Sequence, residues 1–313
     1  MREIAIFGGT SHPALTAEIC AYLAVPPRPV LVKRFANDCL EVQLQSNCRE
    51  RDVFLIQSLV RPVQENLVEL LLMADAARGA SAARVTAVMP HYAYARSDKK
   101  DEARISIGGR LVADLLIAAG ASRVLTMTLH SPQVHGFFSV PVDHLHALRE
   151  LAAHFRASDL ANTVVVSPDL GNAKSAAAFA RRLGLPVAAA AKERHSDTSV
   201  TITSIIGDVT GRNVIILDDE IARGTTIDEL LARLAEREVG SVRIACTHGL
   251  FCHGALDRLA ARPDVAEIVC TNTVPVPSGA HSGKLRVISV APALAEAIQR
   301  IHDGESVSVL FAP

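Results

Sequence analysis

The stretch from Val214 to Leu234 constrains the fold of this chain more than any other. Its first four residues, Val214–Leu217, are apolar without polar alternation, which is typical of a strand covered on both faces of a parallel sheet. Two acids and the small-residue loop Ala222–Thr226 follow, and then leucines recur on one side of a run that predicts a helix capped by Thr226. The stretch therefore predicts one strand, loop and helix unit of an α/β protein.

The loop of this unit has the properties of a phosphate site. N–H groups in the first turn of a helix lack partners and carry the positive end of the dipole, and Gly224 lets the backbone approach an anion. The acids Asp218 and Asp219 would repel phosphate, but carboxylates accept hydrogen bonds from vicinal hydroxyls or hold Mg²⁺. An acid pair beside a phosphate loop indicates a sugar phosphate. The simpler alternative is that the acids are only the polar end of a strand.

Length and composition restrict the class of protein. A chain of 313 residues, 49% of them hydrophobic, suggests two domains with substantial cores. The formal net charge of −1 gives no broad basic field, which argues against nucleic acid and membrane surfaces as partners. The six cysteines form no C-x-x-C pair, so we expect reduced thiols rather than zinc ligands. A strand begins at Ile4, which leaves no room for a signal peptide, and no apolar run reaches membrane-spanning length, so we expect a cytoplasmic location.

The chain contains what we interpret as an internal duplication. A buried strand at 53–57 and a helix at 66–78 repeat the later pattern, and the triplet Glu69-Leu70-Leu71 recurs as Glu229-Leu230-Leu231. The alternative is chance similarity between generic units. Gln57-Ser58 stands where the second copy has its acid pair, so we expect sugar-phosphate chemistry only in the second copy. We predict an α/β protein with domains at 1–144 and 145–289, and with 290–313 packing back on the first.

Several further elements are expected from local patterns. Alternating polarity predicts exposed hairpin strands at 42–45 and 198–206, and apolar spacing predicts a helix at 145–155. A short strand is expected at 306–310. The charge-dense segment 97–109 is either a mobile loop over a site or a solvated connector.

Polar residues gather where apolar strands are predicted to end, which is the edge at which doubly wound sheets bind ligands. They carry both signs of charge, as a nucleotide or phosphate site requires. These residues are Arg96, His130, Asp169, Lys192, Asp218 and Asp219.

Over essentially its full length the chain resembles the ribose-phosphate diphosphokinases, also called phosphoribosyl-diphosphate synthetases. The similarity is carried by the segments 52–58, 92–96, 123–126, 136–138, 165–169, 205–209 and 218–226, together with His130. It implies two tandem type I phosphoribosyltransferase-like domains, each a mainly parallel sheet flanked by helices. It also implies ATP and ribose 5-phosphate as substrates, Mg²⁺ as the cofactor, and a dimer-based homo-oligomer, with a hexamer as one option, in which a neighbouring subunit helps to hold the nucleotide.

The resemblance implies roles for individual residues. Lys192 and Arg194 would stabilise the transferring group, with His130 as a further catalytic residue, and His130 and Asp169 would attend metal ions. Ribose 5-phosphate would be held by Asp218 and Asp219 at its hydroxyls and by Ala222, Arg223, Gly224, Thr225 and Thr226 at its phosphate. The nucleotide would contact Phe35, Asn37, Cys39, Arg96, Ser97 and Lys99.

The chain departs from the pattern of the family at four places. Phe-Ser-Asp-Gly-Glu becomes Phe35–Cys39, which loses both acids expected near the base, although Asp38 or Glu41 could substitute. Changes at 96–99, 192–194 and 222–226 also indicate a divergent branch. The hypotheses are an active diphosphokinase, a related enzyme with a different nucleotide or sugar phosphate, and a silent homologue that regulates an active partner. A true phosphoribosyltransferase is disfavoured because one domain normally suffices for it.

Overall fold

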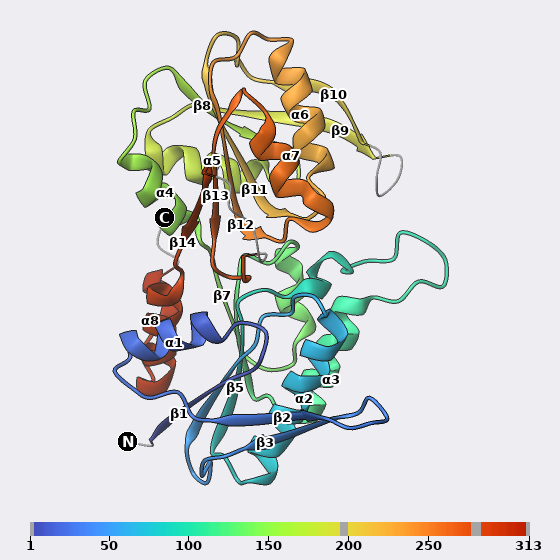
Figure 1. Ribbon diagram of the computed structural model, residues 1–313, viewed down its shortest axis with the longest axis vertical. Helices are drawn as coiled ribbons and strands as arrows, with labels where there is room; N and C mark the ends of the chain where they lie inside the picture. The colour runs from blue at the N-terminus through green and yellow to red at the C-terminus, as the bar shows by residue number, and fades with distance from the viewer. Residues whose placement is uncertain (1–2, 195–199, 277–282, 311–313) are drawn as a thin grey trace. The chain divides into compact units, whose positions relative to one another are not determined.

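The structure is a computed structural model that describes residues 3–194, 200–276 and 283–310. The chain divides into two compact units (Figure 1). Of the described residues, 3–146, 273–275 and 290–310 belong to the first unit, and 147–194, 200–272, 276 and 283–289 belong to the second. Each unit is built on a mainly parallel sheet flanked by helices, so the predicted α/β class is confirmed.

The first unit contains a five-stranded parallel sheet in the order β1-β4-β5-β6-β7. Its strands are β1 (Ile4–Gly8), β4 (Asp52–Ile56), β5 (Arg84–Met89), β6 (Arg123–Met127) and β7 (Val142–Leu145). The helices α1 (Pro13–Tyr22), α2 (Val63–Gly79) and α3 (Gly108–Ala119) and the 3₁₀ helices η1 (Ala93–Arg96) and η2 (Pro132–Phe137) connect them. A separate antiparallel hairpin joins β2 (Val30–Arg34) to β3 (Leu40–Leu44).

The second unit contains a seven-stranded sheet in the order β10-β9-β8-β11-β12-β13-β14, antiparallel only between β10 and β9. Its strands are β8 (Thr163–Ser167), β9 (Val187–Arg194), β10 (Val200–Ile206), β11 (Asn213–Ile221), β12 (Val242–Gly249), β13 (Val265–Thr271) and β14 (Leu285–Ile288). The helices are α4 (Leu148–Arg156), α5 (Ala173–Leu183), α6 (Thr225–Ala235), α7 (Ala255–Ala261) and the 3₁₀ helix η3 (Cys252–Gly254).

Strand β11 is covered on both faces, as its unbroken apolar run predicts. Val214 and Ile216 belong to the core cluster that includes α6 and α7. Ile215 and Leu217 belong to a second cluster, which includes α4 and α5. Alternate side chains of Val214–Leu217 therefore enter two different cores, which is why this run of the strand contains no polar residue.

The two sheets repeat one order of strands, which supports the internal duplication. The order β1-β4-β5-β6-β7 in the first unit matches β8-β11-β12-β13-β14 in the second, and the β2–β3 hairpin occupies the place in the chain that β9 and β10 occupy later. Glu69 lies in α2 and Glu229 in α6, the helices that follow β4 and β11. The repeated triplet therefore lies in corresponding helices.

The last helix of each half packs in the other unit. Helix α4 follows β7 of the first unit but packs against α5 in the second. Helix α8 (Ala291–Asp303) follows β14 of the second unit but packs against α1 in the first. Each unit is thus completed by a helix that the other half of the repeat supplies.

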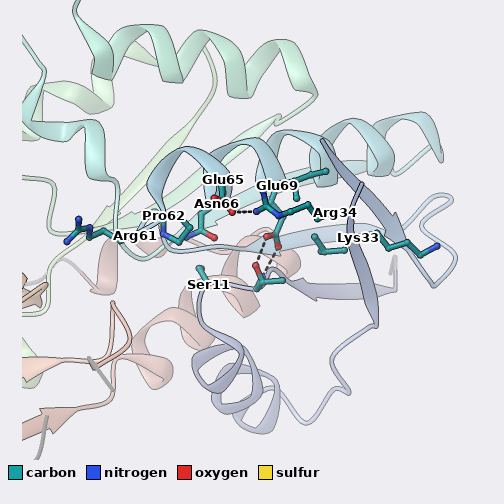
Figure 2. Close-up of a pocket in the computed structure, with 11 residues that line it drawn as sticks. Ser11, Lys33, Arg34, Arg61, Pro62, Glu65, Asn66 and Glu69 are labelled. Atoms are coloured by element: carbon teal, nitrogen blue, oxygen red, sulfur yellow. Dashed lines mark hydrogen bonds and ion pairs between the residues drawn. The ribbon is translucent and has the colours of Figure 1, made fainter. Parts of the chain in front are cut away.

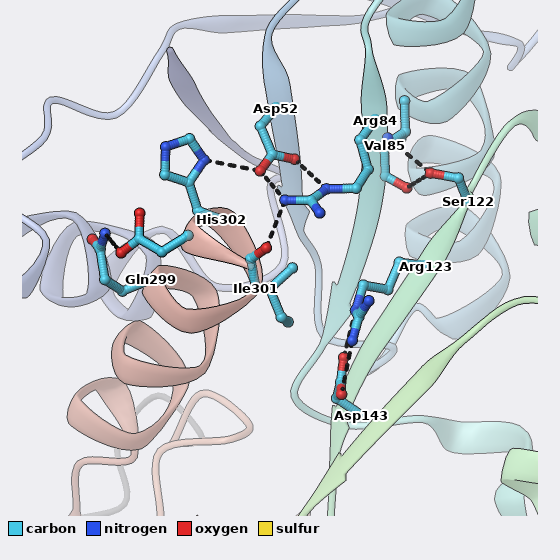
Figure 3. Close-up of polar contacts among 10 residues, drawn as sticks. Asp52, Arg84, Val85, Ser122, Arg123, Asp143, Gln299, Ile301 and His302 are labelled. Atoms are coloured by element: carbon cyan, nitrogen blue, oxygen red, sulfur yellow. Dashed lines mark hydrogen bonds and ion pairs between the residues drawn. The ribbon is translucent and has the colours of Figure 1, made fainter. Parts of the chain in front are cut away.

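A buried carboxylate holds the end of α8 in the first unit (Figure 3). Asp52, 1% exposed at the start of β4, accepts hydrogen bonds from Nε and Nη2 of Arg84 with its two carboxylate oxygens. Arg84 also donates to the Ile301 carbonyl over 2.8 Å, and His302 Nδ1 lies 2.9 Å from Asp52 Oδ2. The charge of Asp52 is therefore paired while it positions the last turn of α8.

Two local predictions were wrong. Residues 307–310 form the 3₁₀ helix η4 (Val307–Leu310) instead of a strand, since the Glu305 amide bonds back to the Arg300 carbonyl and the segment packs on α8. The helix expected at 145–155 begins only at Leu148, because 142–145 pair with β6 as strand β7. The hairpin arm predicted at 198–206 is confirmed over β10 (Val200–Ile206), which pairs antiparallel with β9, while residues 198 and 199 lie outside the described part of the chain.

Candidate sugar-phosphate site

Three neighbouring strands of the second unit bring one cation and three carboxylates to one edge of the sheet. Asp169 follows β8, Lys192 lies in β9 on one side of β8, and Asp218 lies in β11 on the other. Lys192 Nζ donates to Asp169 Oδ2 over 2.5 Å, and the two side chains are 21% and 22% exposed. The predicted residues of this edge therefore do lie together.

Asp218 and Asp219 lie inside β11 and not beyond its end, which corrects the sequence-based expectation. The strand continues to Ile221 because β12 runs parallel to it as far as Gly249. Lys192 likewise lies within β9, since that strand pairs with β10 up to Arg194. Pairing with a neighbouring strand thus sets where each strand ends.

The acid pair is electrostatically crowded. Burial raises the pKa of Asp218 well above its ordinary value, the charge of Asp219 and a hydrogen bond with it raise it further, and Asp169 adds to the effect. Lys192 acts in the opposite direction. An ionised Asp218 is therefore costly here unless a cation or a set of hydrogen-bond donors arrives with the ligand.

Asn172 is a residue of this site that the sequence-based reading missed. Its amide N–H donates to Asp169 Oδ1 over 2.8 Å, and its Nδ2 donates to the carbonyl of Leu217, directly before the acid pair. Asn172 therefore ties the loop after β8 to β11. Asn172 directly precedes α5, and an asparagine in such a place is the signal that the sequence offers, because asparagine is common at helix starts.

The phosphate loop connects β11 to α6 as expected, but its cap differs. Helix α6 begins at Thr225, and the cap position is Gly224, with φ of 76°, so Thr226 is not the cap. A left-handed backbone of this kind favours glycine. The amide N–H groups of Arg223, Gly224, Thr225 and Thr226 donate to no acceptor within the described residues. Ala222, at the start of the loop, accepts a hydrogen bond from the Cys252 amide.

Arg194, the second predicted catalytic cation, ends β9, but its side chain lies outside the described part of the structure. Its role therefore stays a prediction.

The first unit carries the remaining predicted cations on loops after β5 and β6. Arg96 ends η1 and His130 follows β6, and both are exposed. Asp98 Oδ2 accepts from the Ser131 hydroxyl over 2.6 Å, so the two loops are joined next to Arg96 and His130. Lys99 is 69% exposed and pairs with Asp101.

Ser97 closes the base of the charge-dense loop at 97–109. Its Oγ accepts from the Gly108 amide over 2.8 Å, and its carbonyl accepts from the Gly109 amide over 2.9 Å. Ser97 thereby joins the two ends of the loop, a structural role that the sequence did not indicate.

The turn of the β2–β3 hairpin holds the other nucleotide candidates. Phe35 is 49% exposed, Asn37 Oδ1 accepts from the Cys39 amide over 3.3 Å, and the Cys39 thiol is exposed. Asp38 pairs with Arg34 over 2.5 Å, and Glu41 lies 3.8 Å from Lys33. The two acids that could substitute near a base are thus engaged within the hairpin.

A cavity of about 300 Å³ lies in the first unit, beside α2 and the loop after β1 (Figure 2). Polar side chains of its wall form hydrogen bonds with one another. Glu69, 3% exposed, accepts from the Thr10 amide over 2.7 Å and from the Thr10 hydroxyl over 2.5 Å. Gln57 Oε1 accepts from the Ser11 amide and hydroxyl. The polar side chains between β1, β4 and α2 of the first unit therefore hydrogen-bond to one another.

Two general properties of the described chain bear on function. No helix among the described residues is both long and apolar enough to cross a membrane. In the same residues, no group of three or more His, Cys, Asp or Glu side chains is arranged to hold a metal ion.

Comparisons with known proteins agree over nearly the whole chain. The family of the N-terminal domain of ribose phosphate pyrophosphokinase matches residues 4–120, and that of the phosphoribosyl synthetase-associated domain matches 198–312. A putative ribose-phosphate pyrophosphokinase of Streptomyces coelicolor is 72% identical, covering 99% of this chain and 98% of the relative. A ribose-phosphate pyrophosphokinase of Deinococcus radiodurans is 50% identical, covering 98% and 97%. The crystal structure of phosphoribosylpyrophosphate synthetase from Mycobacterium smegmatis superposes with a TM-score of 0.89 at 37% identity, covering 97% of this chain and 100% of that one.

Proposed function

Because the chain belongs to the ribose-phosphate pyrophosphokinase family, we propose that it transfers the β,γ-diphosphoryl group of ATP to the anomeric hydroxyl of ribose 5-phosphate. The products are 5-phosphoribosyl 1-diphosphate and AMP. One bond forms between the anomeric oxygen and the β-phosphorus of ATP, and the bond from that phosphorus to the α,β-bridging oxygen breaks.

The observation that carries this proposal is the sequence of groups along β11 and its loop. Asp218 and Asp219 offer carboxylates to the ring hydroxyls of a pentose, and the free amides of Gly224 to Thr226 offer donors to its phosphate. A carboxylate pair would repel a phosphate placed beside it. The carboxylates and the loop amides therefore suit two different parts of one ligand. A phosphorylated sugar has both kinds of group.

Lys192 is the proposed source of fixed positive charge for the transferring group. It is held by Asp169 next to the acid pair, so its position is set before the substrates arrive. Phosphoryl-type transfer requires little covalent chemistry from the protein and depends mainly on positioning and charge neutralisation. Arg194 is assigned to the same task on the basis of the family resemblance.

Mg²⁺ is the proposed cofactor on the basis of the family resemblance, and the second unit offers carboxylates that it could bind. Burial and then the charge of Asp219 raise the pKa of Asp218, a divalent cation nearby would favour the ionised form, and carboxylate oxygens are the protein ligands that such a cation prefers. Asp169, whose two oxygens accept from Asn172 and Lys192, and His130 of the first unit are the proposed ligands. When bound, Mg²⁺ neutralises charge on the diphosphoryl group.

The nucleotide side of the proposal rests on the first unit. Arg96 and Lys99 offer exposed cations to a triphosphate, and Ser97 fixes the loop that carries Lys99. Phe35, Asn37 and Cys39 are proposed to meet the base in a homo-oligomer built from dimers, a role for which the exposed ring of Phe35 is suited. The cytoplasm is the proposed location.

A second candidate function is a related diphosphokinase with a different nucleotide. The observation that favours it is that Asp38 and Glu41, the acids nearest to the altered hairpin turn, are engaged by Arg34 and Lys33.

Incubation with Mg²⁺, ribose 5-phosphate and each nucleoside triphosphate in turn separates the possibilities. The proposal expects AMP and 5-phosphoribosyl 1-diphosphate with ATP. Preferential release of another nucleoside monophosphate would favour the second candidate. No monophosphate with any triphosphate would contradict both and favour a silent regulatory homologue.

A further inference from the structure

Three consecutive carbonyl groups, at the end of β11 and the start of the phosphate loop, accept hydrogen bonds from one later segment of the second unit. We name residues 251–258, which follow β12 and run into α7, the brace. The Phe251 amide donates to the Ile221 carbonyl over 3.0 Å, and the Cys252 amide to the Ala222 carbonyl over 2.8 Å. The Arg258 guanidinium donates to the Arg223 carbonyl over 2.6 Å. The loop is therefore fixed to the brace at every residue from 221 to 223.

These contacts set the direction of the loop amides. In a planar trans peptide, the N–H of one residue points away from the C=O of the residue before it. Because the Ala222 and Arg223 carbonyls point to the brace, the Arg223 and Gly224 amides point away from it. Together with the free amides of Thr225 and Thr226 in the first turn of α6, they form a run of four consecutive donors without an acceptor among the described residues.

The backbone of the brace has an unusual conformation. Phe251 and His253 have φ of 44° and 56°, left-handed values that cost a residue with a side chain about 1 kcal/mol each. The Phe251 ring is 5% exposed and packs so closely on Gly249 that a Cβ there would lie 2.5 Å from it. A costly conformation of this kind persists where the surrounding structure fixes it, and it occurs frequently at functional sites.

Arg258 is the member of the brace that acts through its side chain. Besides the Arg223 carbonyl, its guanidinium donates to the His253 carbonyl over 3.0 Å and to Asp228 Oδ2 over 3.1 Å. It therefore links the loop, the brace and the first turn of α6. The side chain is 45% exposed, so the core does not depend on it.

We infer that Arg258 is a positioning residue for the phosphate loop, which it orients so that the Arg223–Thr226 amides bind the 5-phosphate of the sugar. This inference rests on the proposed function in one respect only, the identity of the anion as a sugar phosphate. Asp228 supports Arg258 from α6 and shares the role.

The test is the affinity for ribose 5-phosphate, measured by calorimetry on the full chain. Arg258→Ala is expected to weaken this affinity about tenfold, in line with the loss of a hydrogen bond from a charged group. Affinity for Mg²⁺-ATP, which does not use this loop, is expected to stay unchanged. Arg258→Lys, which keeps one donor, should recover part of the loss. Arg262→Ala is the matched control, because Arg262 lies one turn further on and pairs with Asp264.

Asp228→Asn distinguishes positioning from a simple effect of charge. Removal of a negative charge near a phosphate would strengthen binding if charge alone mattered. If Asp228 acts by holding Arg258, the same change weakens binding, by about threefold. Tighter binding by Asp228→Asn, or an unchanged affinity of Arg258→Ala, would overturn the inference.

The outcome is separable from that of the proposed reaction. If the parent binds ribose 5-phosphate and Arg258→Ala weakens that binding without any turnover of ATP in the parent, the reaction is wrong and the inference holds. If the parent turns over both substrates and Arg258→Ala binds the sugar as the parent does, the reaction holds and the inference is wrong. Failure of the parent to bind ribose 5-phosphate would overturn both.

Discussion

Lys192 Nζ lies 2.5 Å from Asp169 Oδ2, so one ion pair joins the neighbouring strands β9 and β8 beside the acid pair. Lys192→Ala is expected to lower kcat with ATP and ribose 5-phosphate by about a hundredfold, because a fixed cation would no longer face the transferring group. Steady-state kinetics measure this effect. Lys174→Ala, which removes an exposed lysine of α5, is the control, and a kcat equal to that of the parent for Lys192→Ala would remove Lys192 from the reaction.

Asp218 should make stability depend on pH. Its pKa in the folded protein is raised, chiefly by burial and then by Asp219, so ionisation of Asp218 disfavours folding. This loss of stability is absent below the ordinary pKa of Asp. It grows as the pH rises from there toward the pKa of Asp218 in the folded protein. Asp218→Asn is therefore expected to match the parent in Tm near pH 4 and to exceed it increasingly toward neutral pH, as thermal unfolding would show.

Asp208 provides a control of opposite sign for this experiment. A hydrogen bond from Arg212 lowers the pKa of Asp208, so its ionisation favours folding and the benefit is lost as the pH falls through that lower value. Asp208→Asn should thus lower Tm at neutral pH. If the Tm of Asp218→Asn at neutral pH were below that of the parent, the conclusion that ionised Asp218 destabilises the fold would be wrong.

Glu69 is expected to stabilise the first unit by closing its polar cavity. Glu69→Ala would leave the Thr10 amide and hydroxyl without their acceptor in a buried place, at a cost of about 2 kcal/mol in the free energy of unfolding. Urea denaturation measures it. Glu65→Ala, on the same cavity but 47% exposed and paired with Arg34, should cost clearly less. Equal losses for the two variants would show that burial of Glu69 is not the cause.

Arg84 is expected to be needed for the pairing of Asp52 under α8. Arg84→Gln would leave a carboxylate that is 1% exposed without its cation, and since Arg84 itself is 30% exposed we expect about 2 kcal/mol of lost unfolding free energy. Arg110→Gln, which breaks an exposed pair with Asp114, should cost under about 0.5 kcal/mol. The double change Asp52→Asn with Arg84→Gln should recover part of the loss. If it proved worse than Arg84→Gln, the uncompensated charge would not be the cause.

The parts of the fold that local sequence decides were predicted well. The unbroken apolar run Val214–Leu217 indicated a strand with two covered faces, and its alternate residues do enter two cores. The alternating residues 42–45 indicated a hairpin arm, and β3 pairs with β2. Side-chain periodicity in both cases reports directly on what covers each face.

Features that depend on distant partners could not be predicted. The acid pair lies inside β11 because β12 extends beside it, and neither strand contains a signal for the length of the other. Arg258 donates to the carbonyl of Arg223, 35 residues earlier. Every residue has a backbone carbonyl, so the sequence does not indicate which carbonyl accepts this hydrogen bond. Residues 306–310 alternate as a strand would, but they pack on α8 as a 3₁₀ helix.

The crossed placement of α4 and α8 restricts how a protein of this kind can be divided or recombined. A gene cut after residue 146 would give a first fragment that lacks α8 and so leaves bare the side of α1 on which it packs. A chimera that took one half from a relative would likewise contain a terminal helix whose packing surface matches the helix of the relative and not that of this chain. Although the two halves repeat one order of strands, each relies on the other for a terminal helix and is therefore not a self-sufficient piece.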